Sequence, residues 1–274
     1  MPEPLTLLVD NGSLEPAATL ALRALAASLG ARLGRRVEPV SLLHSSAVPA
    51  EKIGGTPAEI LEPSLERRLA AGQNDFLILP LFFGPSGALT DYLPARLAHL
   101  RGKHAKLQAT IAAPLFAAHD DRLARILADH VRQAGGTARR VALVDHGSPA
   151  RAVVDVRNAL AQQLGQLLGA GYVVAAASME RRAGPDYDFV EPLLAHLLRQ
   201  PGWNAGEVLI AMQFLSPGRH AGPNGDVATI CREAETASSG HLRTTMTALV
   251  AEHPLLVDIL ADRWRACQAD GPSA

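Results

Sequence analysis

Two short stretches of sequence, LLVDNGS at residues 7–13 and ALVDHGS at residues 142–148, decide the fold. Each is an apolar run of strand length that ends in a polar turn with a glycine. Each is followed by a long segment in which aliphatic residues recur three or four positions apart. That spacing places the aliphatic side chains on one face of a helix. The sequence therefore predicts the same strand, turn and helix twice in one chain.

The similarity between the two halves continues along the chain in the same order. EPSL at residues 62–65 matches EPLL at residues 191–194. Near the end of each half, HDDRLARILADHV from residue 119 matches HPLLVDILADRW from residue 253. The offset between matching stretches stays between 129 and 135 residues. We therefore interpret the chain as a tandem duplication that divides at Gly135-Gly136.

Apolar strand patterns alternate with helical patterns within each half. Strands are expected near residues 5–10, 36–43, 76–83 and 107–112, and again near 139–145, 171–178, 207–214 and 241–247. Such alternation is typical of βαβ units, in which a parallel sheet carries helices on both faces. The sequence predicts an α/β fold with two tandem lobes, residues 1–135 and 136–274, each a parallel sheet of about four strands flanked by helices.

Charge and cysteine content argue against several classes of protein. The chain has 26 basic and 27 acidic residues, so it lacks the basic excess that nucleic acids and anionic membranes attract. Its two cysteines form no disulfide framework and no CxxC motif, which favours a reducing compartment. The sequence shows neither a secretion signal nor an apolar run of bilayer length. We expect a cytoplasmic protein with no nucleic-acid or membrane partner.

The site is expected where the two halves differ on their shared scaffold. Ligands of open parallel sheets bind beyond the carboxyl ends of the strands. At three such ends the first half has Asn11, His44 and Ala88, and the second half has His146, Glu180 and His220. Two imidazoles and a carboxylate suit late first-row divalent metals, and three protein ligands leave coordination positions open. The sequence predicts that His146, Glu180 and His220 form a metal site in the second lobe only, and its open positions suit a site that hands its metal onward or one that does chemistry.

Other interpretations of these residues stay open. A hydrolase would need a GxSxG turn and a nucleotide-binding protein a GxGxxG or GxxxxGK[ST] loop, and the sequence has none of these. Histidine phosphatases have an arginine where this chain has Asp145, which would repel phosphate. A histidine after a strand can be a simple turn residue, and Glu180 can be a solvated charge. His119 and His253 are present in both copies, so we interpret them as structural residues that precede helices.

At the predicted site the sequence resembles the class II tetrapyrrole chelatases, specifically the sirohydrochlorin chelatase group of the CbiX and SirB type. In that group the first strand ends in HGS, the second strand ends with Glu, and a Phe-Leu…Gly-x-His loop follows the third strand. Here the matching stretches are ALVDHGS with His146, SMERR with Glu180 and QFLSPGRH with His220. The resemblance covers nearly the whole chain as two fused copies.

The resemblance implies insertion of Co2+ or Fe2+ into sirohydrochlorin, on the way to cobalamin or sirohaem. His146 and His220 would bind the metal and deprotonate the macrocycle with help from Glu180, and Arg181, Arg182 and Arg219 would face its carboxylates. No cofactor beyond the substrate metal is implied, and the fused halves favour a monomer over a homodimer. Long forms of the group keep histidines in both copies, whereas this chain has Asn11 and Ala88. The alternatives are a non-catalytic tetrapyrrole- or metal-binding paralogue and a structural paralogue that binds neither.

Overall fold

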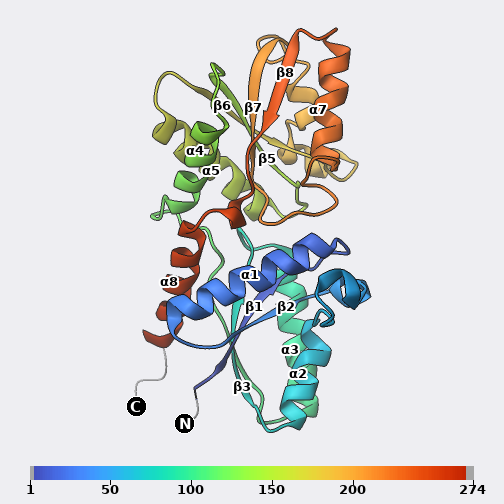
Figure 1. Ribbon diagram of the computed structural model, residues 1–274, viewed down its shortest axis with the longest axis vertical. Helices are drawn as coiled ribbons and strands as arrows, with labels where there is room; N and C mark the ends of the chain where they lie inside the picture. The colour runs from blue at the N-terminus through green and yellow to red at the C-terminus, as the bar shows by residue number, and fades with distance from the viewer. Residues whose placement is uncertain (1–2, 270–274) are drawn as a thin grey trace. The chain divides into compact units, whose positions relative to one another are not determined.

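The computed structural model describes residues 3–269, which form two compact units (Figure 1). The first unit comprises residues 3–115 together with 254–269, and the second comprises Phe116–His253. Each unit is built around one four-stranded sheet in which all neighbouring strands are parallel. The predicted α/β fold with two parallel-sheet lobes is therefore confirmed.

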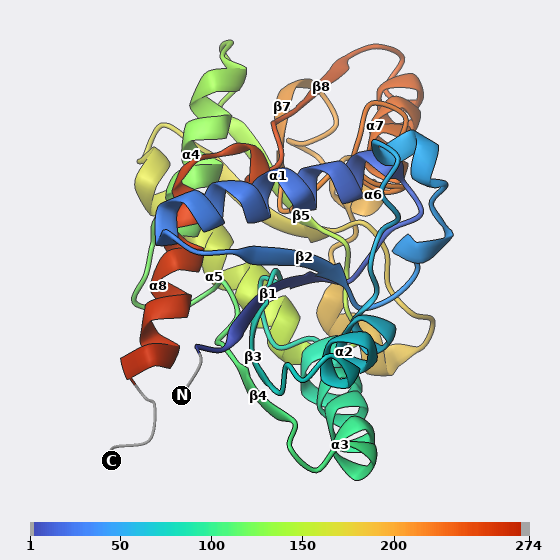
Figure 2. The same cartoon turned by 60° about the horizontal axis from the view of Figure 1, so that its bottom comes forward.

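The sheet of the first unit has the strand order β2-β1-β3-β4. Its strands are β1 (Leu5–Asp10), β2 (Val37–Ser41), β3 (Asp75–Pro80) and β4 (Gln108–Ile111), and its helices are α1 (Pro16–Leu33), α2 (Leu61–Ala70), α3 (Leu93–Lys103) and α8 (Leu255–Ala269). Alternate residues of the buried strands point to opposite faces, so both faces need cover. Figure 2 shows α1 and α8 on one face and α2 and α3 on the other.

The sheet of the second unit repeats this order as β6-β5-β7-β8. Its strands are β5 (Arg140–Asp145), β6 (Val173–Ser178), β7 (Gly206–Met212) and β8 (Leu242–Met246), and its helices are α4 (Arg122–Ala134), α5 (Arg151–Leu168), α6 (Leu194–Leu197) and α7 (Asp226–Ala237). The strand registers also match. Asp10 pairs with Ser41 as Asp145 pairs with Ser178, which shows that the sequence repeat is a structural repeat.

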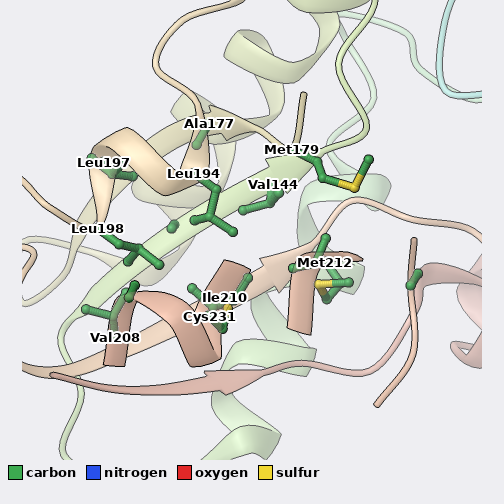
Figure 3. Close-up of a cluster of buried hydrophobic side chains, with 14 of the residues drawn as sticks. Val144, Ala177, Met179, Leu194, Leu197, Leu198, Val208, Ile210, Met212 and Cys231 are labelled. Carbon is green, nitrogen blue, oxygen red and sulfur yellow. The ribbon is translucent and has the colours of Figure 1, made fainter. Parts of the chain in front are cut away.

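Aliphatic side chains build the core of each unit. In the second unit, one buried cluster contains the strand residues Val144, Ile210 and Met212 and the α6 residues Leu194 and Leu197, as Figure 3 shows. All five are 3% exposed or less. Such continuous apolar strands are typical of sheets with helices on both faces, and they fix the strand ends from which the polar loops extend.

The division into units differs from the predicted boundary between residues 135 and 136. Helix α4 packs on α5 and β7 within the second unit, whereas α8 packs on α1 and β3 within the first. Trp264 Nε1 of α8, for example, donates a hydrogen bond to Thr6 Oγ1 over 3.1 Å. The two helices have nearly the same apolar pattern, ILADHV and ILADRW, so pattern alone does not say which sheet each helix covers.

Between residues 3 and 269 no helix is long and apolar enough to cross a membrane.

Candidate metal and catalytic site

The three predicted site residues lie at the carboxyl edge of the second sheet. His146 directly follows β5, Glu180 lies two residues beyond β6, and His220 lies in the loop between β7 and α7. The strand order places β5 between β6 and β7, so the loop that carries His146 lies between the other two. The fold thus brings together residues that are 34 to 74 positions apart in the sequence.

His146 contacts both of the other predicted residues. Its Nε2 lies 3.4 Å from Glu180 Oε1, and its ring centroid lies 4.7 Å from that of His220 at an interplanar angle of 65°. The side chains of His146 and Glu180 are 49% and 60% exposed and that of His220 is 31% exposed, so a large ligand can reach them. Within residues 3–269 no group of three or more His, Cys, Asp or Glu side chains is arranged to hold a metal ion. The site therefore consists of two contacting pairs, His146 with Glu180 and His146 with His220, and it is not a closed cage of three ligands.

Both imidazoles are oriented by a hydrogen bond through Nδ1. His146 Nδ1 lies 2.9 Å from Gly147 O, and His220 Nδ1 lies 2.6 Å from Asp226 Oδ2. A carbonyl and a carboxylate accept hydrogen bonds, so in the neutral rings the proton belongs on Nδ1. Nε2 then carries the lone pair in each ring. Metal-binding histidines usually have this arrangement, in which the second nitrogen donates to a carbonyl or carboxylate.

The contact between His146 and Glu180 is suited to a cation or a proton. With its proton on Nδ1, the His146 ring presents an Nε2 lone pair to a carboxylate oxygen 3.4 Å away. Two electron-rich atoms at this distance repel each other unless a positive charge lies with them. The pair can therefore bind a divalent metal or accept a proton from a ligand.

Asp226 is a residue of this site that the sequence interpretation missed. It is the first residue of α7, and its carboxylate is the hydrogen-bond partner of His220. The loop is closed by the start of the same helix, because the amide of Val227 donates to the carbonyl of His220 over 3.3 Å. An acidic residue after the PNG turn is a typical helix start. Only the folded loop shows that this carboxylate faces the imidazole.

A glycine turn places His146 against the loop that carries Glu180. Gly147 has φ +94°, and a Cβ atom there would lie 1.9 Å from the carbonyl oxygen of Glu180. The amide of Glu180 in turn donates to the carbonyl of His146 over 3.2 Å. Only glycine combines this φ with this close approach. Backbone contacts therefore fix the position of the His146 turn relative to the loop that carries Glu180.

The buried carboxylate of Asp145 lies beneath this turn. Its Oδ1 accepts hydrogen bonds from Ser178 Oγ at 2.5 Å and from the amide of Gly147 at 3.1 Å. Burial raises the pKa of the Asp145 carboxyl above its ordinary value, while the hydrogen bond from Ser178 and the charge of Arg157 act in the opposite direction. Asp145 thus fixes the turn from inside, where no ligand reaches it.

The three arginines that the resemblance assigned to the macrocycle differ in their surroundings. Arg181 forms ion pairs with Asp188 at 2.8 Å and Glu191 at 2.9 Å, so its charge is balanced within its own loop. Arg219 is 82% exposed and lies 3.8 Å from the Asp226 carboxylate. Arg182 is exposed and lies over the ring of Tyr187. Arg182 and Arg219 therefore remain the better candidates to meet an anionic ligand.

At the positions equivalent to His146, Glu180 and His220 the first unit has neither an imidazole nor a carboxylate. One predicted equivalence between the halves is wrong. Leu43, and not His44, corresponds to Glu180, because the Leu43 amide donates to the carbonyl of Asn11 as the Glu180 amide donates to that of His146. The end of a strand cannot be located to one residue within SLLHSS, which explains the error. Asn11, Leu43 and Ala88 supply neither an imidazole nor a carboxylate.

The two histidines interpreted as structural have different surroundings. His253 stacks edge-on against His130 of α4 at a centroid distance of 5.5 Å, and its Nε2 lies 3.6 Å from Asp129 Oδ2. His119 lies in the turn that precedes α4.

The fold, two parallel-sheet lobes in a single chain, is similar to the folds of solved SirB and CbiX structures. SirB from Bacillus subtilis with Fe3+ is similar with a TM-score of 0.71 and 16% identity, over 98% of this chain and 96% of that one. SirB from Bacillus subtilis subspecies spizizenii in complex with cobalt gives 0.70 and 13%, over 98% and 97%. CbiX, the terminal enzyme for biosynthesis of siroheme in denitrifying bacteria, gives 0.59 and 19%, over 96% and 99%. No protein-family model and no curated protein matches the sequence.

Proposed function

We propose that this protein inserts a divalent metal ion, Co2+ or Fe2+, into sirohydrochlorin, as a step toward cobalamin or sirohaem. The observation that carries the proposal is His146, whose Nε2 lies 3.4 Å from Glu180 Oε1 and whose ring contacts that of His220. The likeness to structures of sirohydrochlorin chelatases along the whole chain supports it. In this proposal the metal ion is a substrate, and the reaction needs no resident cofactor.

The chemistry of metal insertion matches the groups at this edge. A divalent ion enters the macrocycle as two pyrrole N–H protons leave, so charge balances when bases accept both protons. Neutral imidazole binds first-row metals and also accepts protons near pH 7. We assign metal binding and proton acceptance to His146 and His220, with Glu180 as the carboxylate that balances charge and assists. Arg182 and Arg219 would contact the carboxylates of the macrocycle.

A carrier that binds metal or tetrapyrrole without turnover is the second candidate. The observation that favours it is the open arrangement of the site, in which no three ligands are grouped within residues 3–269. Such a site binds a metal weakly and releases it readily. In solution we expect a monomer, because the fused lobes supply in one chain what two copies would otherwise supply. We also expect the protein to be cytoplasmic.

An anaerobic absorbance assay tests the proposal. The protein is mixed with sirohydrochlorin and Co2+ or Fe2+, and the rate of metallation is compared with that of a metal-only blank. His146→Ala and His220→Ala should each lower the rate at least about 100-fold, the usual scale for a general base. His44→Asn is the matched control, because it changes an exposed histidine at the corresponding edge of the first unit.

The outcomes separate the candidates. Turnover that is lost in His146→Ala and His220→Ala but kept in His44→Asn supports the chelatase. Stoichiometric binding of metal or sirohydrochlorin, with no rate above the blank, supports the carrier and contradicts the chelatase. A rate above the blank that survives both histidine substitutions would place the chemistry elsewhere.

A further inference from the structure

Helix α5 contains a buried arginine that the proposed chemistry does not use. Arg157 is 1% exposed, although it lies in a helix that otherwise packs aliphatic residues on the sheet. A buried guanidinium is tolerated only when its N–H groups are hydrogen-bonded. Arg157 donates through Nη1 to Val190 O at 2.7 Å and to Ser178 Oγ, and through Nε and Nη2 to Asn158 Oδ1.

These hydrogen bonds lead from Arg157 to the turn that carries His146. A serine hydroxyl has one proton to donate. Ser178 Oγ donates it to Asp145 Oδ1 at 2.5 Å, so the hydroxyl receives the Arg157 bond as an acceptor. Asp145 Oδ1 also accepts from the amide of Gly147 at 3.1 Å. The chain of bonds therefore has one direction, from the Arg157 guanidinium through the Ser178 hydroxyl to the Asp145 carboxylate. Asp145 precedes His146, and its carboxylate binds the amide of Gly147, which follows His146.

The first unit provides an internal comparison. It keeps Ser41, Asp10 and Gly12 at the positions equivalent to Ser178, Asp145 and Gly147. The residue equivalent to Arg157, however, is Leu22, because α1 and α5 are both 18 residues long and begin 135 positions apart. Leu22 is 2% exposed. A leucine therefore satisfies the packing between this helix and the sheet in the first unit, where Ser45 Oγ takes the place of the guanidinium and donates to Ser41 Oγ over 2.8 Å.

We propose that Arg157 is a positioning residue for His146, acting through Ser178 and Asp145. Within this molecule the arginine occurs in the unit that has the imidazole and is replaced in the unit that has Asn11 instead. The carboxylate of Asp145 is held on the Gly147 amide by a partner on its far side, and the turn keeps His146 beside Glu180. The consequence for metal insertion rests on the proposed function, whereas the consequence for the position of His146 does not.

Arg157→Leu tests the proposal, because leucine is the residue that the first unit has at this position. Arg157→Lys keeps the charge but loses the planar fork that reaches several acceptors. Arg140→Leu is the matched control, since Arg140 begins the same strand, β5, at the end opposite to His146. Thermal melting shows whether each variant is folded, and Ser178→Ala breaks the same chain at its middle if Arg157→Leu does not fold.

Two readouts are needed, and the first does not depend on catalysis. In the metal-free protein, NMR of the Gly147 amide and the His146 ring reports the hydrogen bond and the imidazole orientation. We expect both sets of signals to change in Arg157→Leu, to change less in Arg157→Lys, and to stay as in the wild type in Arg140→Leu. The second readout is Co2+ affinity and metallation rate, which should fall about 10- to 100-fold in Arg157→Leu, as for other residues that orient a metal ligand.

The results distinguish failure of this inference from failure of the proposed function. A folded Arg157→Leu protein with unchanged His146 and Gly147 signals overturns the positioning role, whatever the wild type catalyses. Changed signals in Arg157→Leu, with the control unchanged, support it even if the wild type proves to be a carrier. A wild type with no rate above the blank counts against the chelatase alone.

Discussion

Replacing one glycine in each unit separates the contribution of the fold from that of the site. Gly147→Ala adds a Cβ atom 1.9 Å from the carbonyl oxygen of Glu180, at φ +94°. Gly12→Ala adds one 1.7 Å from the carbonyl oxygen of Leu43, at φ +90°. The two substitutions thus impose the same strain on the same turn, but only the turn in the second unit carries an imidazole.

The size of the effect follows from these distances. Ordinary contact begins at 3.4 Å, so the loops must separate by about 1.5 Å to admit the new methyl group. A positive φ costs a non-glycine residue roughly 1–2 kcal/mol. We expect each variant to lose about 2–4 kcal/mol of unfolding free energy. A displacement of about 1 Å at a reacting group costs about 100-fold in rate, so metallation should fall by about that factor in Gly147→Ala alone.

Two assays check this prediction. Urea unfolding followed by circular dichroism gives the loss of stability, and the anaerobic absorbance assay gives the metallation rate under conditions in which both variants are folded. Gly12→Ala should keep the wild-type rate within about threefold, which corresponds to less than about 1 kcal/mol. Equal losses of rate in the two variants, or a folded Gly147→Ala protein with wild-type activity, would refute the assignment of the site to the turn at His146.

Three further substitutions test single groups. Asp226→Asn should lower Co2+ affinity about 10- to 100-fold by calorimetry, because an amide orients His220 less firmly than a carboxylate does; unchanged affinity contradicts this. Burial raises the pKa of Asp10 from 3.8 to about 6, so folding stability is lost as pH rises between these values. Asp10→Asn should therefore stabilise the protein by up to about 3 kcal/mol at pH 7 but little at pH 4, measured by urea unfolding. Burial and His253 lower the pKa of His130, so stability should fall as pH drops below 6.5, and His130→Leu should weaken that loss in thermal melts.

The sequence predicted the fold, and it singled out His146, Glu180 and His220 as the candidate site, because the chain contains its own comparison. LLVDNGS and ALVDHGS share the features that make a strand and a turn and differ at Asn11 and His146. What could not be predicted depends on contacts distant in sequence or on single positions. Asp226 faces His220 only because the intervening loop closes on the start of α7. The apolar patterns of α4 and α8 are so similar that the sequence does not show that α4 packs in the second unit and α8 in the first.

The two units also show which part of a short motif records fold and which part records chemistry. Gly12 persists in a unit without site histidines, because any side chain there would collide with the carbonyl of Leu43. The aspartate and the glycine of the DHGS turn, which both units share, are therefore explained by the geometry of the turn. They identify the scaffold rather than the activity. His146 differs between the units, as does Arg157, which connects to it through buried hydrogen bonds. On a duplicated scaffold, chemistry is best sought in a changed surface residue whose buried support has changed with it.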